Sequence, residues 1–491
     1  MTILSLDDRR QIQGIVTTGF GHLSCGGFLF VRFRDTEPAR GWLRALLPEV
    51  TTATPWEKNE RGEKRRPRTT LNVALTYDGL EELEVPRKTL GTFPTEFAFG
   101  MPSRATILGD HDESDPARWE LGGPSNPPVH AVLVVYANGE QELDARLDEL
   151  RHGFADAVEE LRVERGARTD RSREPFGFAS DGISQPIIEG IRGDDPSDPF
   201  VVKTGEFILG HVNEMGLYPL SPAVAADEDP DGILPPYPEG ALPEYRDLGR
   251  NGTYFVYRKL HQDVAGFWRF LQSRVSAANR AELQHEMLRT ASKLMGRWPS
   301  GAPLELAPYE DDPALETAND FMYRPGDEQG LACPIGAHIR RANPRDSLKQ
   351  IADTREDSIR SANQHRLVRR GIPYGTSLFP PEQIEDGRAP LDLEDDGQPR
   401  GLHFFALAGD LKRQFEFVQQ MWLNNPTFAG LFDNKDPIVG DNDEPGYMSI
   451  GRLPIRSSVS DIPRFVFMRG GAYFFLPSIA ALRYIAREMT P

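Results

Sequence analysis

The sequence predicts an α+β fold built from two halves, and three observations support this. Short apolar runs rich in β-branched and aromatic residues, such as Phe28–Phe33 and Ala131–Ala137, have the length and composition of buried strands. Elsewhere, apolar residues recur at steps of three or four, which is typical of amphipathic helices. A segment rich in Pro and acidic residues, 222–250, divides the chain, and the strand and helix patterns begin again after it.

The elements follow in order along the chain. In the first half, we expect strands at 28–33 and 131–137 and a helix at 139–164, where six apolar residues from Leu143 to Leu161 form one face. In the second half, we expect strands at 253–258, 402–407, 465–468 and 472–476, and helices at 259–272, 281–296, 411–423 and 478–488. Gly470 and Gly471, between the last two strands, suit a tight turn.

Three segments interrupt these patterns. Residues 56–69 are charged, 222–250 are rich in Pro and acid, and 384–400 are acidic, so all three are expected at the surface. The middle segment is the best boundary. We therefore predict modules at 1–220 and 251–491 with a connection at 221–250.

The composition excludes several classes of protein. The 491 residues carry 56 Lys and Arg against 74 Asp and Glu, a net charge of −18, which disfavours nucleic acid or an anionic membrane as partner. Two cysteines exclude a disulfide framework or a Cys-rich metal module. With no apolar leader or membrane-spanning run, we expect a cytoplasmic protein or one exported without a cleaved leader. The oligomeric state stays open.

Hydrolase motifs are missing from the sequence. None of the ten histidines forms HExxH, and neither a GxSxG elbow nor a Walker A loop occurs. Elimination leaves chemistry based on a histidine-bound metal or a cofactor.

The first informative stretch is Cys333–Arg345, CPIGAHIRRANPR, in which His338 is followed closely by three arginines. A neutral imidazole is the usual proximal ligand of haem iron, and guanidinium groups suit the haem propionates. On the residues alone, a structural histidine beside solvated arginines explains the stretch as well.

Two further stretches are informative. Phe176–Pro186, FGFASDGISQP, places Asp181 among small and aromatic residues, where a buried carboxylate could act as acid and base towards peroxide. The alternative is an Asx-turn before Gly182. His365–Gly375, HRLVRRGIPYG, offers arginines that could polarise a peroxide bond, or simply an exposed basic turn.

Together and in this order, the three stretches resemble the dye-decolourising peroxidase family of haem enzymes. The resemblance extends from Ile12–His22 at the start to Arg469–Pro477 at the end, and includes Asn251–Asp263 and Arg413–Leu423. One departure is an extra residue between Gly177 and Asp181.

The resemblance implies a fold of two ferredoxin-like modules, with antiparallel sheets and flanking helices, and one haem b per chain, held mostly by the second module. It assigns His338 as axial ligand of the haem iron, with Glu416 orienting its ring. Asp181 would be the acid–base group for peroxide, and Arg369, chosen over Arg370 by its distance from the turn glycine, would stabilise the developing negative charge.

The resemblance also implies a set of haem contacts. These are Gly182, Ile183, Ser184, Asn343, Pro344, Arg345, Leu402 and Phe404. Leu402 and Phe404, two residues apart on a predicted strand, share a face. Tyr374, in a turn expected to reach solvent, is a candidate surface radical site for bulky donors; the alternative is a tyrosine that packs the turn.

The function implied is that of a haem b peroxidase that reduces hydrogen peroxide and oxidises dyes and phenolic donors by one-electron steps. Peroxide-driven oxygenation is an alternative within enzymes. A haem carrier or sensor, or a deferrochelatase-like protein with little turnover, is the other alternative, and it would need His338 without Asp181 or Arg369.

Overall fold

The computed structural model describes residues 4–487 except 60, 155, 169–172, 180–184, 193, 194, 196, 239–241, 349–353 and 443. The strands of its large sheet are β1 (Cys25–Phe33), β2 (Thr69–Leu75), β3 (Ala131–Ala137), β4 (Val158–Ala167), β9 (Thr253–Gln262), β10 (Val368–Arg369), β11 (Ile372–Tyr374), β12 (Gly401–Ala408) and β15 (Val466–Leu476). Three small two-stranded sheets pair β5 (Ile187–Ile188) with β6 (Val201–Val202), β7 (Ala223–Ala225) with β8 (Tyr245–Asp247), and β13 (Gly446–Ile450) with β14 (Ser457–Ile462).

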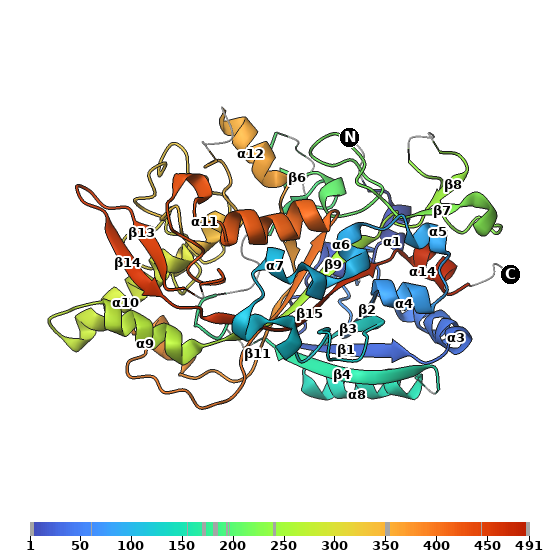
Figure 1. Ribbon diagram of the computed structural model, residues 1–491, viewed down its shortest axis with the longest axis horizontal. Coiled ribbons are helices and arrows are strands. Elements are labelled where there is room, and N and C mark those ends of the chain that lie inside the picture. The colour runs from blue at the N-terminus through green and yellow to red at the C-terminus, as the bar shows by residue number, and fades with distance from the viewer. Residues whose placement is uncertain are drawn as a thin grey trace.

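The helices cover the outside of the sheet and extend one end of the molecule (Figure 1). They are α1 (Leu6–Gln11), α2 (Gly14–Thr17), α3 (Thr36–Leu46), α4 (Tyr77–Glu82), α5 (Arg87–Leu90), α6 (Thr95–Phe99), α7 (Ala105–Leu108), α8 (Glu140–His152), α9 (Val264–Arg274), α10 (Arg280–Met295), α11 (His338–Ala342), α12 (Arg355–Asn363), α13 (Pro381–Glu385) and α14 (Ile479–Ile485). Two π-helical segments, Leu411–Glu416 and Val418–Leu423, occupy the predicted helix 411–423.

The two halves of the sheet have the same strand order. In the first half the order is β2-β3-β1-β4, and in the second it is β10-β12-β9-β15, with β11 also paired to β12. Numbered along the chain, both halves read 2-3-1-4, which is the antiparallel ferredoxin-like arrangement. The predicted α+β class with two such modules is confirmed, whereas the module bounds 1–220 and 251–491 stay a prediction.

The sheet curves until its two ends meet. The halves join where β15 pairs with β2 through Phe475 and Leu75. At the other side, β11 lies against β4, and the His403 Nε2 of β12 is 3.1 Å from the carbonyl oxygen of Arg165. The result is a barrel made from both halves.

Aromatic side chains fill the barrel. The Phe28 ring of β1 lies 4.7 Å from Phe405 of β12, and the Phe30 ring lies 4.9 Å from Tyr257 of β9. Leu29, between these two phenylalanines, belongs instead to the outer core beneath the helices. The strand period of two therefore separates an inner core from an outer core.

Two predicted helices and one turn need correction. The expected helix 139–164 ends at His152, and 158–167 form the edge strand β4, whose charged side chains hide the alternation of a strand. The expected helix 259–272 begins only at Val264, because β9 continues to Gln262. Gly470 and Gly471 do not form a turn: they lie inside β15, where a register shift bends the strand.

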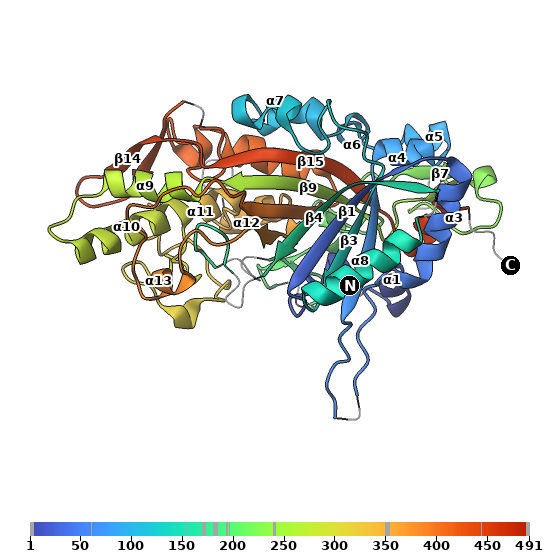
Figure 2. The same ribbon diagram turned by 90° about the horizontal axis from the view of Figure 1, so that it is seen from below.

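Two other features are seen in the described part of the chain. The charged segment near 56–69 forms a hairpin that projects from the body of the molecule (Figure 2). Among these residues, no helix combines the length and the apolar character needed to cross a membrane.

The closure of the barrel can be tested at Gly166 of β4. A Cβ atom there would lie 2.6 Å from Ile372 Cγ2 and 2.9 Å from the Pro373 carbonyl oxygen of β11. We expect Gly166→Ala to lower the free energy of unfolding by about 1–3 kcal/mol, because strand β11 has to move. Urea unfolding measures this. Gly41→Ala in α3, where the nearest atom is 3.7 Å away, is the control and should cause no loss; an equal effect of both variants would contradict the closure.

Candidate functional site

A cavity of about 650 Å³ lies on the outer face of the second half of the sheet. Leu402 and Phe404 of β12 line it, as the spacing of two predicts, while His403 between them points into the barrel. Strand β9 contributes Arg258 and Leu260 to the same wall. The side chains opposite come from α11, from the π-helical segments and from residues within 176–179 and 185–192.

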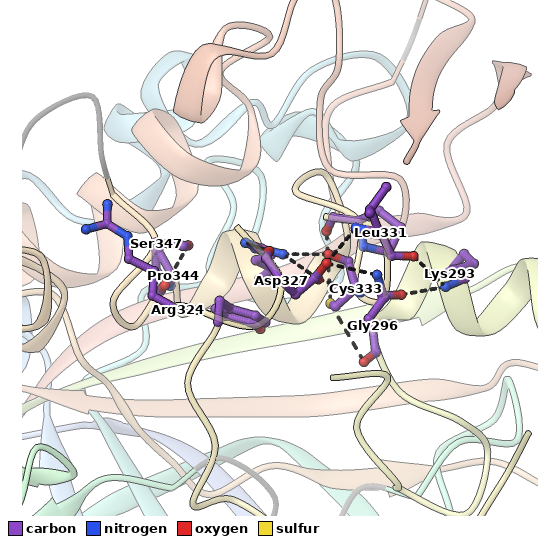
Figure 3. Close-up of polar contacts among 12 residues, drawn as sticks. Lys293, Gly296, Arg324, Asp327, Leu331, Cys333, Pro344 and Ser347 are labelled. Carbon is purple, nitrogen blue, oxygen red and sulfur yellow. Dashed lines mark hydrogen bonds and ion pairs between the residues drawn. The ribbon is translucent and has the colours of Figure 1, made fainter. Parts of the chain in front are cut away.

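His338 begins α11 and lines the cavity. The loop before it is held by Asp327, whose carboxylate accepts the backbone N–H groups of Leu331 at 2.6 Å and Cys333 at 2.8 Å (Figure 3). Arg340, on the same short helix as His338, donates to Asp327 at 3.0 Å. The helix that carries His338 is thus tied to this loop by a buried ion pair.

The His338 ring is oriented by Asp436. Nδ1 lies 3.0 Å from Asp436 Oδ2, and the other carboxylate oxygen accepts the backbone N–H groups of Ile438 and Val439, both at 2.9 Å. Burial would raise the pKa of Asp436, but His338, the Arg341 guanidinium and the backbone N–H of Val439 hold it below its ordinary value. Because an ionised carboxylate only accepts, Nδ1 carries the proton and Nε2 presents its lone pair.

Glu416 does not take the position expected for it. Arg104 donates to both of its oxygens, at 2.9 and 2.7 Å, and the Tyr473 hydroxyl donates to Oε1 at 3.0 Å. On this π-helical segment Phe415 occupies the place that faces the cavity, so the next side chain points away from it. The prediction that Glu416 orients His338 is therefore wrong, and Asp436 has that place.

Two neighbouring arginines differ in what holds them. Arg369 and Arg370 both line the cavity, and the Arg369 backbone N–H donates to Gln185 at 3.1 Å. The Arg370 guanidinium donates to the carbonyls of Ile15 at 2.8 Å and Val16 at 2.9 Å, and so anchors the N-terminal segment. The Arg370 guanidinium is thus committed to backbone carbonyls, and the assignment of Arg369 to chemistry in the cavity stays a prediction.

The cavity wall carries concentrated positive charge. Burial, together with repulsion from Arg345 and Arg369, lowers the pKa of Arg366 to about 9. Burial and the nearby Arg345 also lower the pKa of Arg297 to about 10. An anionic group placed beside these side chains would therefore be stabilised.

The predicted contacts of 343–345 divide into two groups. Asn343 lines the cavity, and both polar atoms of its amide are buried with no hydrogen-bond partner among the described residues. Pro344 and Arg345 do not line it. One guanidinium nitrogen of Arg345, Nη1, donates to the carbonyls of Asn319 at 2.9 Å and Phe321 at 2.7 Å and so holds a loop, and the contact of Arg345 with a haem stays a prediction.

Tyr374 is not a surface residue. It ends the short strand β11, is 9 % exposed, and its ring lies 4.7 Å from the His403 ring. The residues exposed to solvent begin only at Gly375. The predicted surface radical site at Tyr374 is therefore wrong, because a strand, not a turn, positions this side chain.

Four predicted residues, Asp181, Gly182, Ile183 and Ser184, lie outside the described residues. Others were missed from the sequence: Asp436, which contacts His338, and Arg366, which lines the cavity. Arg366 stands in the same basic stretch as Arg369, so composition could have found it. Asp436 is 98 residues after His338, in a stretch without a motif.

The fold and the site together define a class of protein: two-module α+β barrels in which a histidine and buried arginines line one large cavity. Residues 11–169 match the DyP dimeric alpha+beta barrel domain. The chain is 30 % identical to a dye-decolorizing peroxidase of Mycena epipterygia, over 94 % of this chain and 83 % of that one. The protein belongs to the dye-decolourising peroxidase family. It is a peroxidase, and the family implies a haem cofactor.

Solved structures agree with this assignment. A dye-decolorizing peroxidase from Auricularia auricula-judae is 26 % identical, with a TM-score of 0.76, over 97 % of this chain and 99 % of that one. A dye-decolorizing peroxidase in complex with 2,6-dimethoxyphenol is also 26 % identical, with a TM-score of 0.75 and the same coverage.

The Asp436 carboxylate is expected to stabilise the fold as well as orient His338. Asp436→Ala leaves two backbone N–H groups and a histidine N–H without an acceptor in a buried place, so the free energy of unfolding should fall by about 3 kcal/mol or more. Urea unfolding measures it. Asp436→Asn, which keeps an oxygen for the backbone groups, should recover part of the loss, and the exposed Glu444→Ala should be neutral. A neutral Asp436→Ala would refute the buried contact.

Proposed function

We propose that this protein is a haem b peroxidase, with one haem per chain, that reduces hydrogen peroxide and oxidises phenols and dyes by one-electron steps. The observation that carries the proposal is the His338–Asp436 pair at the 650 Å³ cavity. The volume lies within the range of protein sites for organic cofactors, about 300–1,000 Å³.

The cavity wall suits an amphipathic macrocycle with carboxylates. Apolar side chains, including Leu402, Phe404 and Phe415, form one part of the wall. The buried guanidinium groups of Arg297 and Arg366, whose pKa values are lowered by burial, form another. Haem has an apolar ring and two anionic propionates. The apolar side chains would contact the ring, and the guanidinium groups would bind the propionates.

Two polar observations also suit haem. The buried amide of Asn343 has a donor and an acceptor without partners among the described residues, as expected where a polar ligand group binds. Across the residues that the structure describes, no three His, Cys, Asp or Glu side chains cluster to hold a bare metal ion. A single imidazole is enough for iron whose other ligands come from a porphyrin.

Different residues of the chain would bind the cofactor, orient its ligand and stabilise charge during the reaction. When bound, haem supplies the iron that exchanges electrons with peroxide and with donors. His338 would bind the iron through Nε2, and Asp436, by accepting from Nδ1, would keep the ring in place and increase its basicity. Arg369, a fixed cation in a buried wall, would stabilise negative charge as the peroxide bond breaks.

We assign Asp181 to proton transfer on the strength of its motif. Ala179 and Gln185, on either side of it in the sequence, both line the cavity. The carboxylate would accept the first peroxide proton and return it to the departing oxygen. The phenolic donors are proposed because a similar structure is a complex with 2,6-dimethoxyphenol.

Haem binding is tested at His338. We expect His338→Ala to lose the Soret absorbance of the purified protein and the peroxide-dependent bleaching of dyes, because the imidazole is the iron ligand. His285→Ala, at an exposed position of α10, is the matched control and should keep both. A full haem complement and normal bleaching in His338→Ala would refute the assignment.

The role of Arg369 is tested by stopped-flow mixing with peroxide. Arg369→Leu should slow the reaction about 10²–10³-fold at unchanged haem content, and Arg369→Lys should restore part of the rate. Arg370→Leu should mainly reduce stability, since it loses the Ile15 and Val16 carbonyls. A haem carrier would show little reaction with peroxide even in the parent protein.

A further inference from the structure

A basic arm projects from the body of the molecule. It is the hairpin formed by residues 57–59 and 61–68 (Figure 2). In the sequence, residues 57–68 contain six Lys and Arg against three Glu, whereas the whole chain has a net charge of −18. The arm therefore has the opposite charge to the molecule that carries it.

The base of the arm is fixed on the barrel. His22 Nε2 lies 3.0 Å from the carbonyl oxygen of Pro67, and the His22 ring packs edge-on against Trp56, with ring centres 5.1 Å apart. Asn138, which follows β3, donates its backbone N–H to the carbonyl of Arg68 at 3.1 Å. The arm is thus held in one position before any partner binds, which keeps the entropic cost of docking small.

The charges on the arm are unfavourable for a free hairpin. The backbone N–H of Asn59 donates to the carbonyl of Glu63 at 2.8 Å, which closes the turn. This pairing sets Lys58 directly opposite Lys64, and like charges in that arrangement destabilise a strand pair. Lys58, Lys64 and Arg65 are exposed, and none of them forms an ion pair with another described residue. An anionic partner would relieve the repulsion.

An acidic loop elsewhere in the chain, residues 306–316, has the matching charge. It contains four Asp and Glu and no Lys or Arg. Glu310, Asp312 and Glu316 are exposed and form no ion pair within the described part of the chain. Tyr309, which is 82 % exposed, adds an aromatic face on which a guanidinium can pack. Among the described residues, no hydrogen bond or ion pair joins this loop to the arm of the same chain.

We propose that the protein associates with a second copy of itself, the basic arm of one copy binding the acidic loop of the other. One exposed ion pair contributes little to binding, but several cations on one fixed arm can pair with the loop together. Each copy carries both an arm and a loop, so two copies can exchange both contacts in a twofold dimer. The contact does not involve the cavity and is independent of the peroxidase function.

The length of the arm makes this contact compatible with the net charge of the two bodies. Roughly five or six residues per strand, at about 3.3 Å each, give an arm of about 15–20 Å. This exceeds the Debye length, about 10 Å at 0.1 M salt. The arm can therefore meet the loop while the two acidic bodies stay largely screened from each other. A nucleic acid or an anionic membrane is a poorer partner, because its extended negative charge would also meet the body.

The mass of the purified protein in solution tests the association. Sedimentation in about 0.1 M salt should show a species larger than a single chain of 55.0 kDa, and about 1 M salt, where the Debye length is about 3 Å, should dissociate it. Reversing three charges of the arm should weaken association about tenfold or more, the worth of three exposed ion pairs. This arm variant carries Lys58→Glu, Lys64→Glu and Arg65→Glu.

A charge swap identifies the surface that the arm binds. The loop variant carries Glu310→Lys, Asp312→Lys and Glu316→Lys. Alone, the loop variant should associate as poorly as the arm variant. An equal mixture of the two variants should associate again, because each arm then meets a loop of opposite charge on the other variant.

A matched control reverses three exposed cations outside the arm. It carries Lys88→Glu, Arg280→Glu and Arg452→Glu. The control should associate like the parent, and all variants should keep the urea unfolding midpoint of the parent, because every substituted side chain is exposed.

Three outcomes would overturn the proposal. The first is a parent protein that sediments as single chains over the whole concentration range, even if its arm binds an immobilised polyanion such as heparin. The second is an arm variant that associates like the parent or loses no more than the control. The third is a mixture of the arm and loop variants that stays as single chains, which would exclude the acidic loop as the partner surface.

Discussion

The alternation of side chains along β9 and β12 is the constraint on which the rest of this structure depends. On β12, His403 and Phe405 enter the barrel while Leu402 and Phe404 face the cavity. On β9, Tyr257 packs in the barrel and Arg258 faces the cavity. A shift of one residue in either strand would exchange the two sets. The aromatic core that closes the barrel and the wall that receives a cofactor are therefore two faces of the same strands.

Outside the sheet, hydrogen bonds from buried arginines hold loops that contain little regular secondary structure. Arg340 holds the loop before His338 through Asp327, and Arg341 donates to the carbonyls of Asn434 at 2.9 Å and Asn425 at 2.6 Å. Arg345 does the same for the loop 319–321. Each guanidinium offers five donors in a rigid plane, so one side chain can satisfy several carbonyls that no helix or strand has paired.

Local sequence was enough to predict part of the fold and of the site. The strands β1 and β3 are buried on both faces, so their apolar runs are almost unbroken and easily recognised. Some site residues lie in short stretches whose chemistry can be recognised from the residue types. The structure brings four of them to one cavity: His338, Arg369, Leu402 and Phe404.

Other parts could not be predicted, for physical reasons. The edge strand β4 carries charges that obscure its period of two, so the sequence predicts the end of a helix there. Asp436 contacts His338 only because the chain returns after 98 residues. The position of Glu416 could not be predicted, because the phase of the helix decides whether Phe415 or Glu416 faces the cavity. Such pairings depend on the tertiary fold, and no spacing in the sequence records them.

The position of β15 has a consequence for the order of events during synthesis. This strand, formed by residues 466–476, lies between β9 and β2 in the middle of the sheet, and Val466 and Met468 line the cavity. The ribosome must therefore release residues 466–476 before the second ferredoxin-like module can complete its sheet. The first module, whose four strands end at Ala167, has all its strands much earlier. A cofactor held against Val466 and Met468 would therefore wait for this strand, and the partly assembled second module is exposed to aggregation until the strand arrives.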